Sequence, residues 1–163
     1  MEPLTEQQIR ASFVNCSKGE AKRLNVPRSL ADQPWEHLDF LGWRDPQSRV
    51  RGYVVAEVDG APYGIVLRST DGSAGVPRKN LCTWCLTPHG SGGVVLMVAP
   101  RSGKAGANGD SVGTYLCADL QCSLYVRGKL VSDQGRMPES LTLEQQVARL
   151  TGNLATFLRR VRG

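Results

Sequence analysis

Four of the five cysteines in this chain occur as two closely spaced pairs. Cys82 and Cys85 form a Cys-x-x-Cys motif within LCTWC, and Cys117 and Cys122 form a second pair within CADLQC. A short spacing lets the two sulfurs of a pair converge on one point, and four thiolates at tetrahedral positions are a donor set that zinc prefers. We therefore predict that these four cysteines bind one zinc ion.

A redox-active pair is the main alternative for Cys82 and Cys85. A thioredoxin-type motif begins a helix within a βαβ unit, whereas the residues that follow here, TPHG, disfavour a helix. The second pair has four intervening residues instead of the usual two. The two pairs are nevertheless separated by a strand-turn-strand segment, which would fold them together, so zinc is the favoured interpretation.

Zinc held by four cysteines has no position left for water, so we expect a structural site and not a catalytic one. His89, four residues after Cys85, is an alternative ligand in place of one cysteine. Cys16 has no partner nearby in the sequence, and we interpret it as a small, half-buried thiol. With two histidines, no suggestive carboxylate pair and no Ser/His motif, the sequence does not predict an enzyme.

The elements that would position the cysteines can be predicted from local patterns. The segment RGYVVAEVDGAPYGIVLRST indicates a β-hairpin that turns at Asp59-Gly60. GGVVLMVAP and SVGTYLCAD indicate a second strand pair, joined by a polar, glycine-rich loop that we expect to be mobile. A short helix is expected at the last cysteines. A cysteine turn, a hairpin and a short helix in that order are the plan of a treble-clef zinc finger.

Helices are predicted at both ends of the chain. Thr5 and Gln8 can form a capping box at the start of an N-terminal helix that continues to about residue 24. The following segment, WEHLDFLGWRDPQSRV, is interpreted as an irregular, partly buried connector. Near the C-terminus, apolar residues recur at steps of three and four after a cap at Ser140 or Thr142, which predicts an amphipathic helix.

These elements predict one α+β domain over residues 1–163, built from antiparallel β-hairpins and a treble-clef zinc finger with N-terminal and C-terminal helices on either side. We place the N-terminal helix and connector at 1–48, the β-hairpin at 49–75, the zinc finger at 76–130 and the C-terminal amphipathic helix at 138–162.

The composition restricts the partners and the compartment. A net charge of +5 favours an acidic protein, RNA or another anion. The N-terminal residues show no signal-peptide pattern, and no segment approaches the ~20 apolar residues of a membrane span. We therefore expect a cytoplasmic protein with no membrane contact, whose cysteines are thiols or metal ligands and not disulfides.

Three segments resemble the FBP or FusB-type family: LCTWC, GTYLCADLQC and the opening PLTEQQIRASFVNCSKGEAKRLNVP. In the second, Tyr115 stands two residues before the third cysteine and Asp119 two residues after it. The resemblance extends over most of the chain and implies a C-terminal treble-clef zinc finger that binds elongation factor G. It also implies a non-enzymatic translation factor, because the resistance proteins of the family release elongation factor G from ribosomes stalled by fusidic acid. Those proteins carry a separate N-terminal helical bundle, where this sequence has one predicted helix.

Carried over to this chain, the resemblance makes Cys82, Cys85, Cys117 and Cys122 the zinc ligands and places Tyr115 on the partner-binding face.

Further partner-binding candidates follow from the residue types themselves. Trp84 lies between two ligands, where a side chain tends to point away from the metal, and tryptophans often anchor protein interfaces. The alternative is that Trp84 and Tyr115 pack against the C-terminal helix. Arg78, Lys79 and Arg127 are candidate charge partners for an acidic factor.

The alternative function is a zinc-containing module that binds RNA or the ribosome directly, with basic residues on phosphates and aromatic side chains stacked on bases. No small-molecule substrate is expected in either case.

Overall fold

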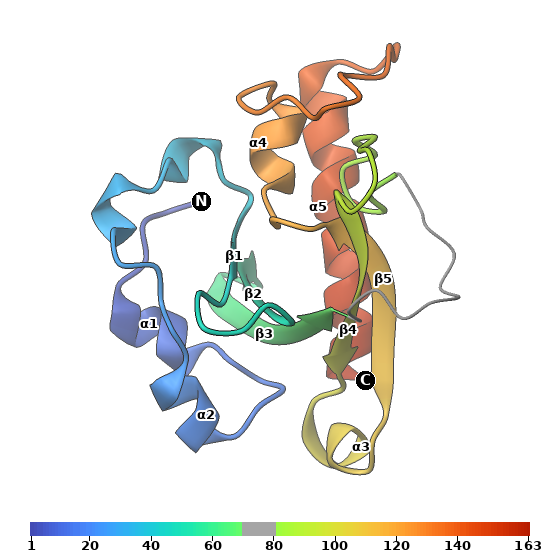
Figure 1. Cartoon of the computed structure of the whole chain (residues 1–163). Coiled ribbons are helices and arrows are strands. Elements are labelled where there is room, and N and C mark those ends of the chain that lie inside the picture. The colour runs from blue at the N-terminus through green and yellow to red at the C-terminus, as the bar shows by residue number, and fades with distance from the viewer. Residues whose placement is uncertain (70–80) are drawn as a thin grey trace.

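The computed structural model describes residues 1–69 and 81–163. One antiparallel five-stranded sheet lies at its centre, with the strands in sequence order (Figure 1). The predicted α+β fold with antiparallel hairpins is therefore confirmed. The strands are β1 (Phe40–Arg44), β2 (Arg51–Val58), β3 (Ala61–Ser69), β4 (Val94–Pro100) and β5 (Ser111–Cys117).

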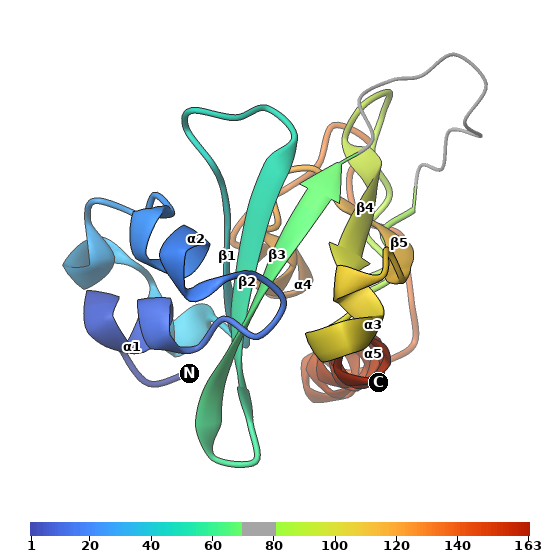
Figure 2. The same ribbon diagram turned by 90° about the horizontal axis from the view of Figure 1, so that it is seen from below.

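Helices cover both faces of the sheet. The two N-terminal helices lie on one side and the C-terminal helix lies on the other, as the two views in Figures 1 and 2 show. The helices are α1 (Glu6–Ala11), α2 (Lys18–Arg23), α3 (Gly103–Ala107), α4 (Cys122–Val126) and α5 (Leu143–Arg162), with single 3-10 turns at Leu30–Asp32 and Trp35–His37.

The strand β2 contributes to two hydrophobic cores. Alternate residues of a strand point to opposite faces, so Tyr53 and Val55 join the core with α1 and α2, while Val54 and Ala56 join the core with α5. Because both faces are covered, β2 is a nearly continuous apolar segment and not an alternating one. The sheet thus connects the N-terminal helices to the cysteine-bearing half.

The hairpin of β2 and β3 turns where the sequence predicts. Asp59 and Gly60 have φ angles of 52° and 77°, and the strands pair from Val58 opposite Ala61 onward. Positive φ at both central residues is the geometry of a type I′ turn, which matches the twist of the two strands.

The expected single N-terminal helix is instead two short helices. Between α1 and α2 the chain is extended beside β3, where Gly64 N–H donates to Ser12 O at 2.9 Å and Val14 N–H donates to Gly64 O at 3.0 Å. A new capping box, formed by Ser17 and Glu20, then begins α2. Pairing with β3 therefore overrides the helical pattern in the middle of this segment.

Two other expectations are corrected by the structure. The predicted irregular connector contains β1, which pairs with β2 along its whole length. The first four residues of β1 are all buried, so the strand lacks the alternation that would have revealed it. The glycine-rich loop that was expected to be mobile contains α3, and Ser102 N–H ties it to Val161 O of α5 at 2.8 Å.

The predicted C-terminal helix is confirmed as α5, which begins at Leu143 and has Thr142 as its N-cap within a capping box completed by Gln145. No helix among the described residues is long and apolar enough to cross a membrane. The buried face of α5 consists of Gln146, Leu150, Leu154, Phe157, Leu158 and Val161.

Candidate metal centre

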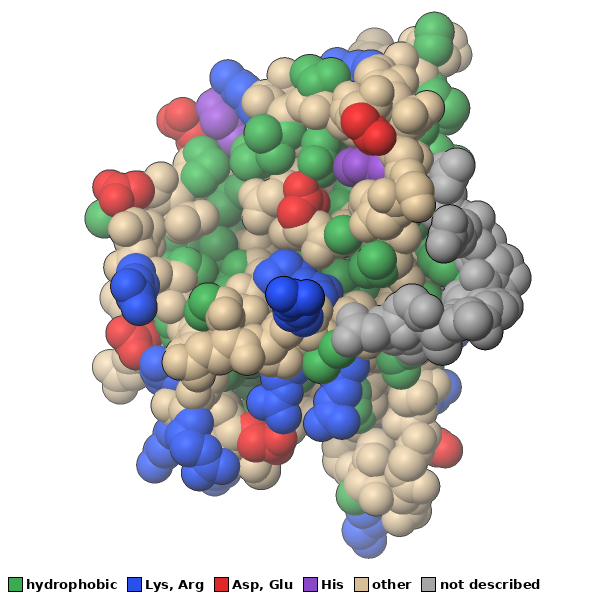
Figure 3. Space-filling model, in the orientation of Figure 1, with side chains coloured by type: hydrophobic (Ala, Val, Ile, Leu, Met, Phe, Trp, Pro, Cys, Tyr) green, Lys and Arg blue, Asp and Glu red, His purple; other side chains and the backbone are tan. Residues whose placement is uncertain are grey.

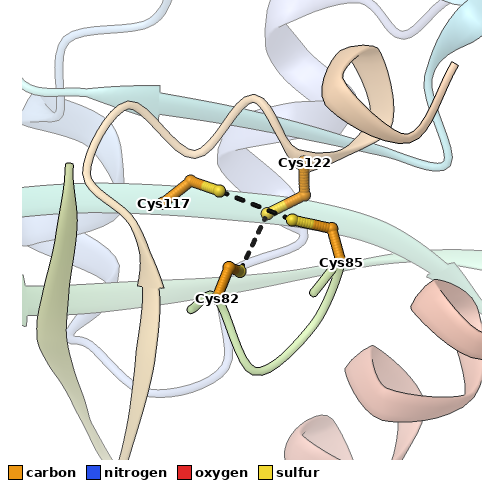
Figure 4. A group of neighbouring side chains, drawn as sticks. All are labelled: Cys82, Cys85, Cys117 and Cys122. Atoms are coloured by element: carbon orange, nitrogen blue, oxygen red, sulfur yellow. Dashed lines mark hydrogen bonds between the residues drawn. The ribbon is translucent and has the colours of Figure 1, made fainter. Parts of the chain in front are cut away.

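The four paired cysteines meet in one buried cluster (Figure 4). Cys82 Sγ lies 3.6 Å from Cys122 Sγ, and Cys85 Sγ lies 3.5 Å from Cys117 Sγ. All four sulfurs lie within 4.8 Å of one another. With Zn–S bonds of ~2.3 Å, the sulfurs of a tetrahedral site are ~3.8 Å apart, so the cluster has the dimensions of a zinc site.

A tight turn shapes each pair. Leu86 N–H donates to Cys82 O at 2.9 Å, and Leu120 N–H donates to Cys117 O at 3.0 Å. Leu86 and Leu120 have φ angles of 55° and 62°. This left-handed conformation costs a non-glycine residue about 1–3 kcal/mol. Both turns bear that cost because the conformation directs the sulfurs toward one point, and metal binding would offset it.

The clustered sulfurs resist full ionisation. Burial opposes a negative charge on Cys82, but hydrogen bonds from Cys117, Cys122 and Cys85 hold its pKa well below the ordinary value. Hydrogen bonds with Cys117, Cys82 and Cys85, together with burial, raise the pKa of Cys122 well above that value. One thiolate is thus favoured and a further one is opposed. A divalent cation would remove this opposition, so the donor chemistry also fits zinc.

Two other candidate side chains lie outside the four-thiol group. His89 is buried, and its Nε2 lies 3.2 Å from Cys117 Sγ, where an Nε2–H can donate to the sulfur. The His89 ring packs perpendicular to Tyr125 with centroids 4.8 Å apart. This arrangement supports Cys117 and does not require His89 to replace it. Cys16 is half-buried on the N-terminal side, and burial raises its pKa.

Trp84 is a core residue, which corrects the expectation that it anchors a partner. Its side chain is 1% exposed, and its ring centroid lies 5.4 Å from that of Phe40 and 5.6 Å from that of Phe157. Asn153 Nδ2 of α5 donates to both Thr83 O and Trp84 O at 3.1 Å. The alternative, packing against the C-terminal helix, therefore holds for Trp84.

The second cysteine turn lies directly on the sheet. Gln121 Nε2 donates to Gly42 O of β1 at 2.9 Å, and the Ser123 hydroxyl accepts from Asp39 N–H at 3.0 Å. A Cβ at position 42 would lie 2.6 Å from Leu120 O. Glycine at this position therefore permits the close approach of the turn to β1.

The remaining partner-binding candidates differ in their surroundings and in whether the structure describes them. The Arg127 guanidinium donates to both carboxylate oxygens of Asp39, at 2.6 and 2.8 Å, and this contact raises the pKa of Arg127. Its charge is therefore neutralised within the chain, contrary to the expectation of a cation available to a partner. Tyr115 is half-buried on β5. Arg78 and Lys79 lie outside the described residues.

Sequence reasoning missed three polar residues that hold the site in place, namely Asp39, Gln121 and Asn153. Their bonds join residues 88, 79 and 69–70 positions apart in the sequence. No local spacing can reveal such pairs. Co-variation between the paired positions is the signal that could have found them.

Comparisons with known proteins agree with this geometry. A family model described as the FBP C-terminal treble-clef zinc-finger matches residues 8–161. The solved structure of the fusidic acid resistance protein FusC aligns with 97% of this chain at a TM-score of 0.58 and 18% sequence identity. At that identity the likeness concerns the fold, and the chain spans 57% of the FusC chain. No curated protein matches the sequence.

Proposed function

This chain belongs to the FBP C-terminal treble-clef zinc-finger family, with zinc as its cofactor, and we propose that it is a non-enzymatic factor that binds elongation factor G. The observation that carries the proposal is the family match over nearly the whole chain, joined to a four-thiol cluster of zinc-site dimensions. The resemblance of LCTWC and GTYLCADLQC to the elongation factor G-binding proteins supplies the partner.

The chemistry of the site supports a binding role. Four thiolates would complete the coordination of zinc and leave no position for a reactive water. The sulfurs are also buried, at 0–3% exposure for each cysteine, so a substrate could not reach the metal. The role left to zinc is to fix the two turns and the surface around them.

Exposed apolar side chains gather near the zinc site. The large hydrophobic residues that are exposed in the described chain lie in or beside the zinc finger and at the start of α5, and apolar groups near a rigid scaffold favour protein docking. Figure 3 shows one face of the molecule, on which hydrophobic side chains are most frequent in the upper half and Lys and Arg side chains in the lower half. The exposed residues are Leu81, Leu130, Val131, Met137 and Leu143.

The proposed docking surface therefore differs from the one that the sequence suggested. Trp84 supports the first cysteine turn from within the core, whereas Tyr115, Val131 and Met137 are candidates for direct contact with elongation factor G. Tyr115 lies beside that turn, because its carbonyl oxygen accepts from Thr83 N–H at 2.8 Å.

A pull-down of purified elongation factor G tests the proposal. We expect the zinc-loaded chain to retain the factor and a chelator to abolish retention. Val131→Glu combined with Met137→Glu should weaken retention, whereas the matched pair Ala148→Glu and Thr151→Glu, on the exposed side of α5, should not. Absence of retention with zinc bound would refute the proposal. Retention that is unchanged by metal loss would show that binding of elongation factor G does not depend on zinc.

The same binding would connect the chain to fusidic acid. A factor that removes elongation factor G from drug-stalled ribosomes should restore protein synthesis in a reconstituted translation reaction. We propose this activity for the zinc-loaded chain, and titration of the chain into reactions containing fusidic acid measures it.

The alternative in which aromatic side chains stack on RNA bases gains no support from the structure. All aromatic residues of the chain lie among the described residues, and each is buried or half-buried. A stacking platform requires exposed rings.

A further inference from the structure

Two arginines near the zinc site are paired with carboxylates: Arg127 lies 2.6 Å from Asp39, and Arg149 lies 2.6 Å from Glu139. The side chains of these two ion pairs are between 9% and 27% exposed, so the pairs belong to the fold and leave little charge for a ligand. Arg136, also in this half, is exposed, and its guanidinium donates to Val126 O at 2.7 Å and to Gln146 Oε1 at 2.8 Å.

A group of four cations, which we call the basic end, lies where α3 meets the last turn of α5. It consists of Lys104, Arg159, Arg160 and Arg162, all exposed. Among the described residues, no carboxylate oxygen lies within 4.0 Å of the side-chain nitrogens of the first three. Arg162 lies 3.7 Å from Asp59, but these side chains are 66% and 86% exposed. Such a pair is weak in water.

The fold holds the basic end together and away from the zinc site. Ser102 donates to α5 twice, from its N–H to Val161 O at 2.8 Å and from its hydroxyl to Arg162 O at 3.0 Å. Both views show α3 beside the C-terminal end of α5 (Figures 1 and 2). Asn153 holds the cysteine turn, and α5 continues from there to Arg162, about 14 Å farther along its axis.

Acidic and apolar groups are scarce at this end. No acidic residue follows Glu144 in the sequence, and Asp59 and Asp110 are the acids beside the basic end in the described structure. Within residues 1–69 and 81–163, the exposed large hydrophobic residues lie elsewhere, at positions 81, 130, 131, 137 and 143. A protein interface usually has an apolar centre, whereas a surface of cations alone suits a chain of phosphates.

We propose that the basic end binds the phosphate backbone of an RNA helix. Arginine guanidinium groups match phosphate oxygens in geometry and charge. The absence of an exposed aromatic ring among the described residues argues against single strands, whose bases would need a stacking surface. The choice of RNA over DNA rests on the proposed function, because a factor that acts on elongation factor G works beside ribosomal RNA.

Arginines in the last turn of a helix also favour the helix dipole. That role concerns the stability of α5 and does not require Lys104, which lies on another element. It also predicts no affinity for nucleic acid. Measurements of RNA affinity and of thermal stability therefore distinguish the two roles.

Fluorescence anisotropy with a 20-base-pair RNA duplex tests the proposal on the zinc-loaded full chain. We expect binding at low salt that weakens steeply as salt is added. The triple variant Lys104→Gln, Arg159→Gln, Arg160→Gln should bind at least about tenfold more weakly, and the slope of log affinity against log salt should fall by about 2–3, at roughly 0.9 per phosphate contact.

A matched triple variant, Lys22→Gln, Arg23→Gln, Arg28→Gln, removes the same three charges from exposed positions on and after α2. It should keep most of the affinity, and thermal unfolding should show that both variants remain folded. Equal loss in the two variants, or no binding by the parent chain at low salt, would overturn the proposal. Equal affinity for a DNA duplex would overturn the choice of RNA.

Elongation factor G retention is measured separately on the same variants. If the basic-end variant loses that protein and keeps RNA, the surface is a protein contact and the proposal fails. If RNA binding is lost and the factor is retained, the proposal is supported. Failure of the proposed function would instead appear in the parent chain, which would not retain the factor at all.

Discussion

We expect four sulfur atoms to control the folding of the half of the molecule that follows β3. Zinc binding contributes about 10–16 kcal/mol in small zinc peptides, which is similar to the whole ~5–15 kcal/mol stability of a typical domain. The sulfurs lie in the core with α5, beside Trp84 and Leu116. Loss of the metal would leave buried thiols that are no longer joined by an ion, in addition to the strained turns at Leu86 and Leu120.

Substitution of single cysteines gives a first prediction. Cys117→Ser should lose stoichiometric zinc and abolish folding of the zinc finger, because a serine hydroxyl is a poor substitute for a soft thiolate. Cys16→Ser, a substitution outside the cluster, should retain one zinc per chain. Elemental analysis with circular dichroism measures both. A folded Cys117→Ser protein with full zinc content would contradict the four-thiol site.

A buried tyrosine gives a prediction for alkaline pH. Burial and the hydrogen bond from Tyr53 Oη to Asp45, at 2.6 Å, raise the pKa of Tyr53 to about 12 from 10.0. The folded state therefore keeps a proton that the unfolded state releases between pH 10 and about 12. The stability that this hydrogen bond adds is complete below pH 10 and is lost as pH rises through about 12.

The variant Tyr53→Phe, which lacks the hydroxyl that donates to Asp45, tests this prediction. At pH 7 the free energy of unfolding of this variant should be about 1–3 kcal/mol lower than that of the parent chain, because Asp45 loses one of its hydrogen-bond donors. Denaturant melts at increasing pH should show this difference shrinking above pH 10. A constant difference up to pH 12 would show that Tyr53 does not titrate as expected.

At the scale of elements, a single ion pair attaches α4 to the start of β1. Arg127 and Asp39 meet through two hydrogen bonds, and their side chains are 17% and 9% exposed. Gln121 and Ser123 bond to the same stretch of chain. The short helix of the zinc finger is therefore oriented by the sheet as well as by the metal.

This pair predicts strong coupling in a double-mutant cycle. Arg127→Gln and Asp39→Asn should each cost about 2 kcal/mol, between the values for exposed and fully buried pairs, since each leaves a partly buried charge without its partner. The double variant should cost less than the sum, with a coupling energy of about 1–3 kcal/mol. Denaturant unfolding of the four proteins measures it. Additive costs would show that the ion pair is not what holds α4.

The sequence predicted those elements whose signals are local. The Asp59-Gly60 hairpin, the strand pair between the cysteine pairs and α5 follow from turn chemistry and periodicity, and the cysteine spacing indicated the metal cluster. The sequence did not predict that the N-terminal helix is divided into α1 and α2, because pairing with β3 causes that break. It also did not predict β1, which forms by pairing with β2. The side of the turn on which Trp84 lies depends on α5, 69 residues away. Contacts at that separation leave no local pattern.

At the scale of the whole molecule, the sheet makes one unit of the N-terminal and zinc-bearing halves. The core with α5 contains Phe40 and Val54 from β1 and β2 as well as the four cysteines, and the opposite core shares the same two strands. The two cores therefore lie back to back on one layer of backbone. Disturbance of the metal should reach the N-terminal side.

Hydrogen exchange can test this unity. On addition of a chelator, amide protection should be lost together in peptides from β2 and β5, because both strands lie in the core that contains the thiols. Mass spectrometry of the two peptides follows the loss, and readdition of zinc should restore both. Persistent protection of β2 after β5 has opened would show that the halves unfold separately.

The contact of Leu120 and Gln121 with Gly42 has a consequence for self-association. β1 is an outermost strand, and an uncovered strand at the margin of a sheet offers its backbone groups to other chains. The second cysteine turn occupies that margin, and its Gln121 side chain uses the outward carbonyl of Gly42. Release of zinc would free the turn and expose the strand, so we expect the zinc-free chain to associate with itself more readily than the zinc-loaded chain.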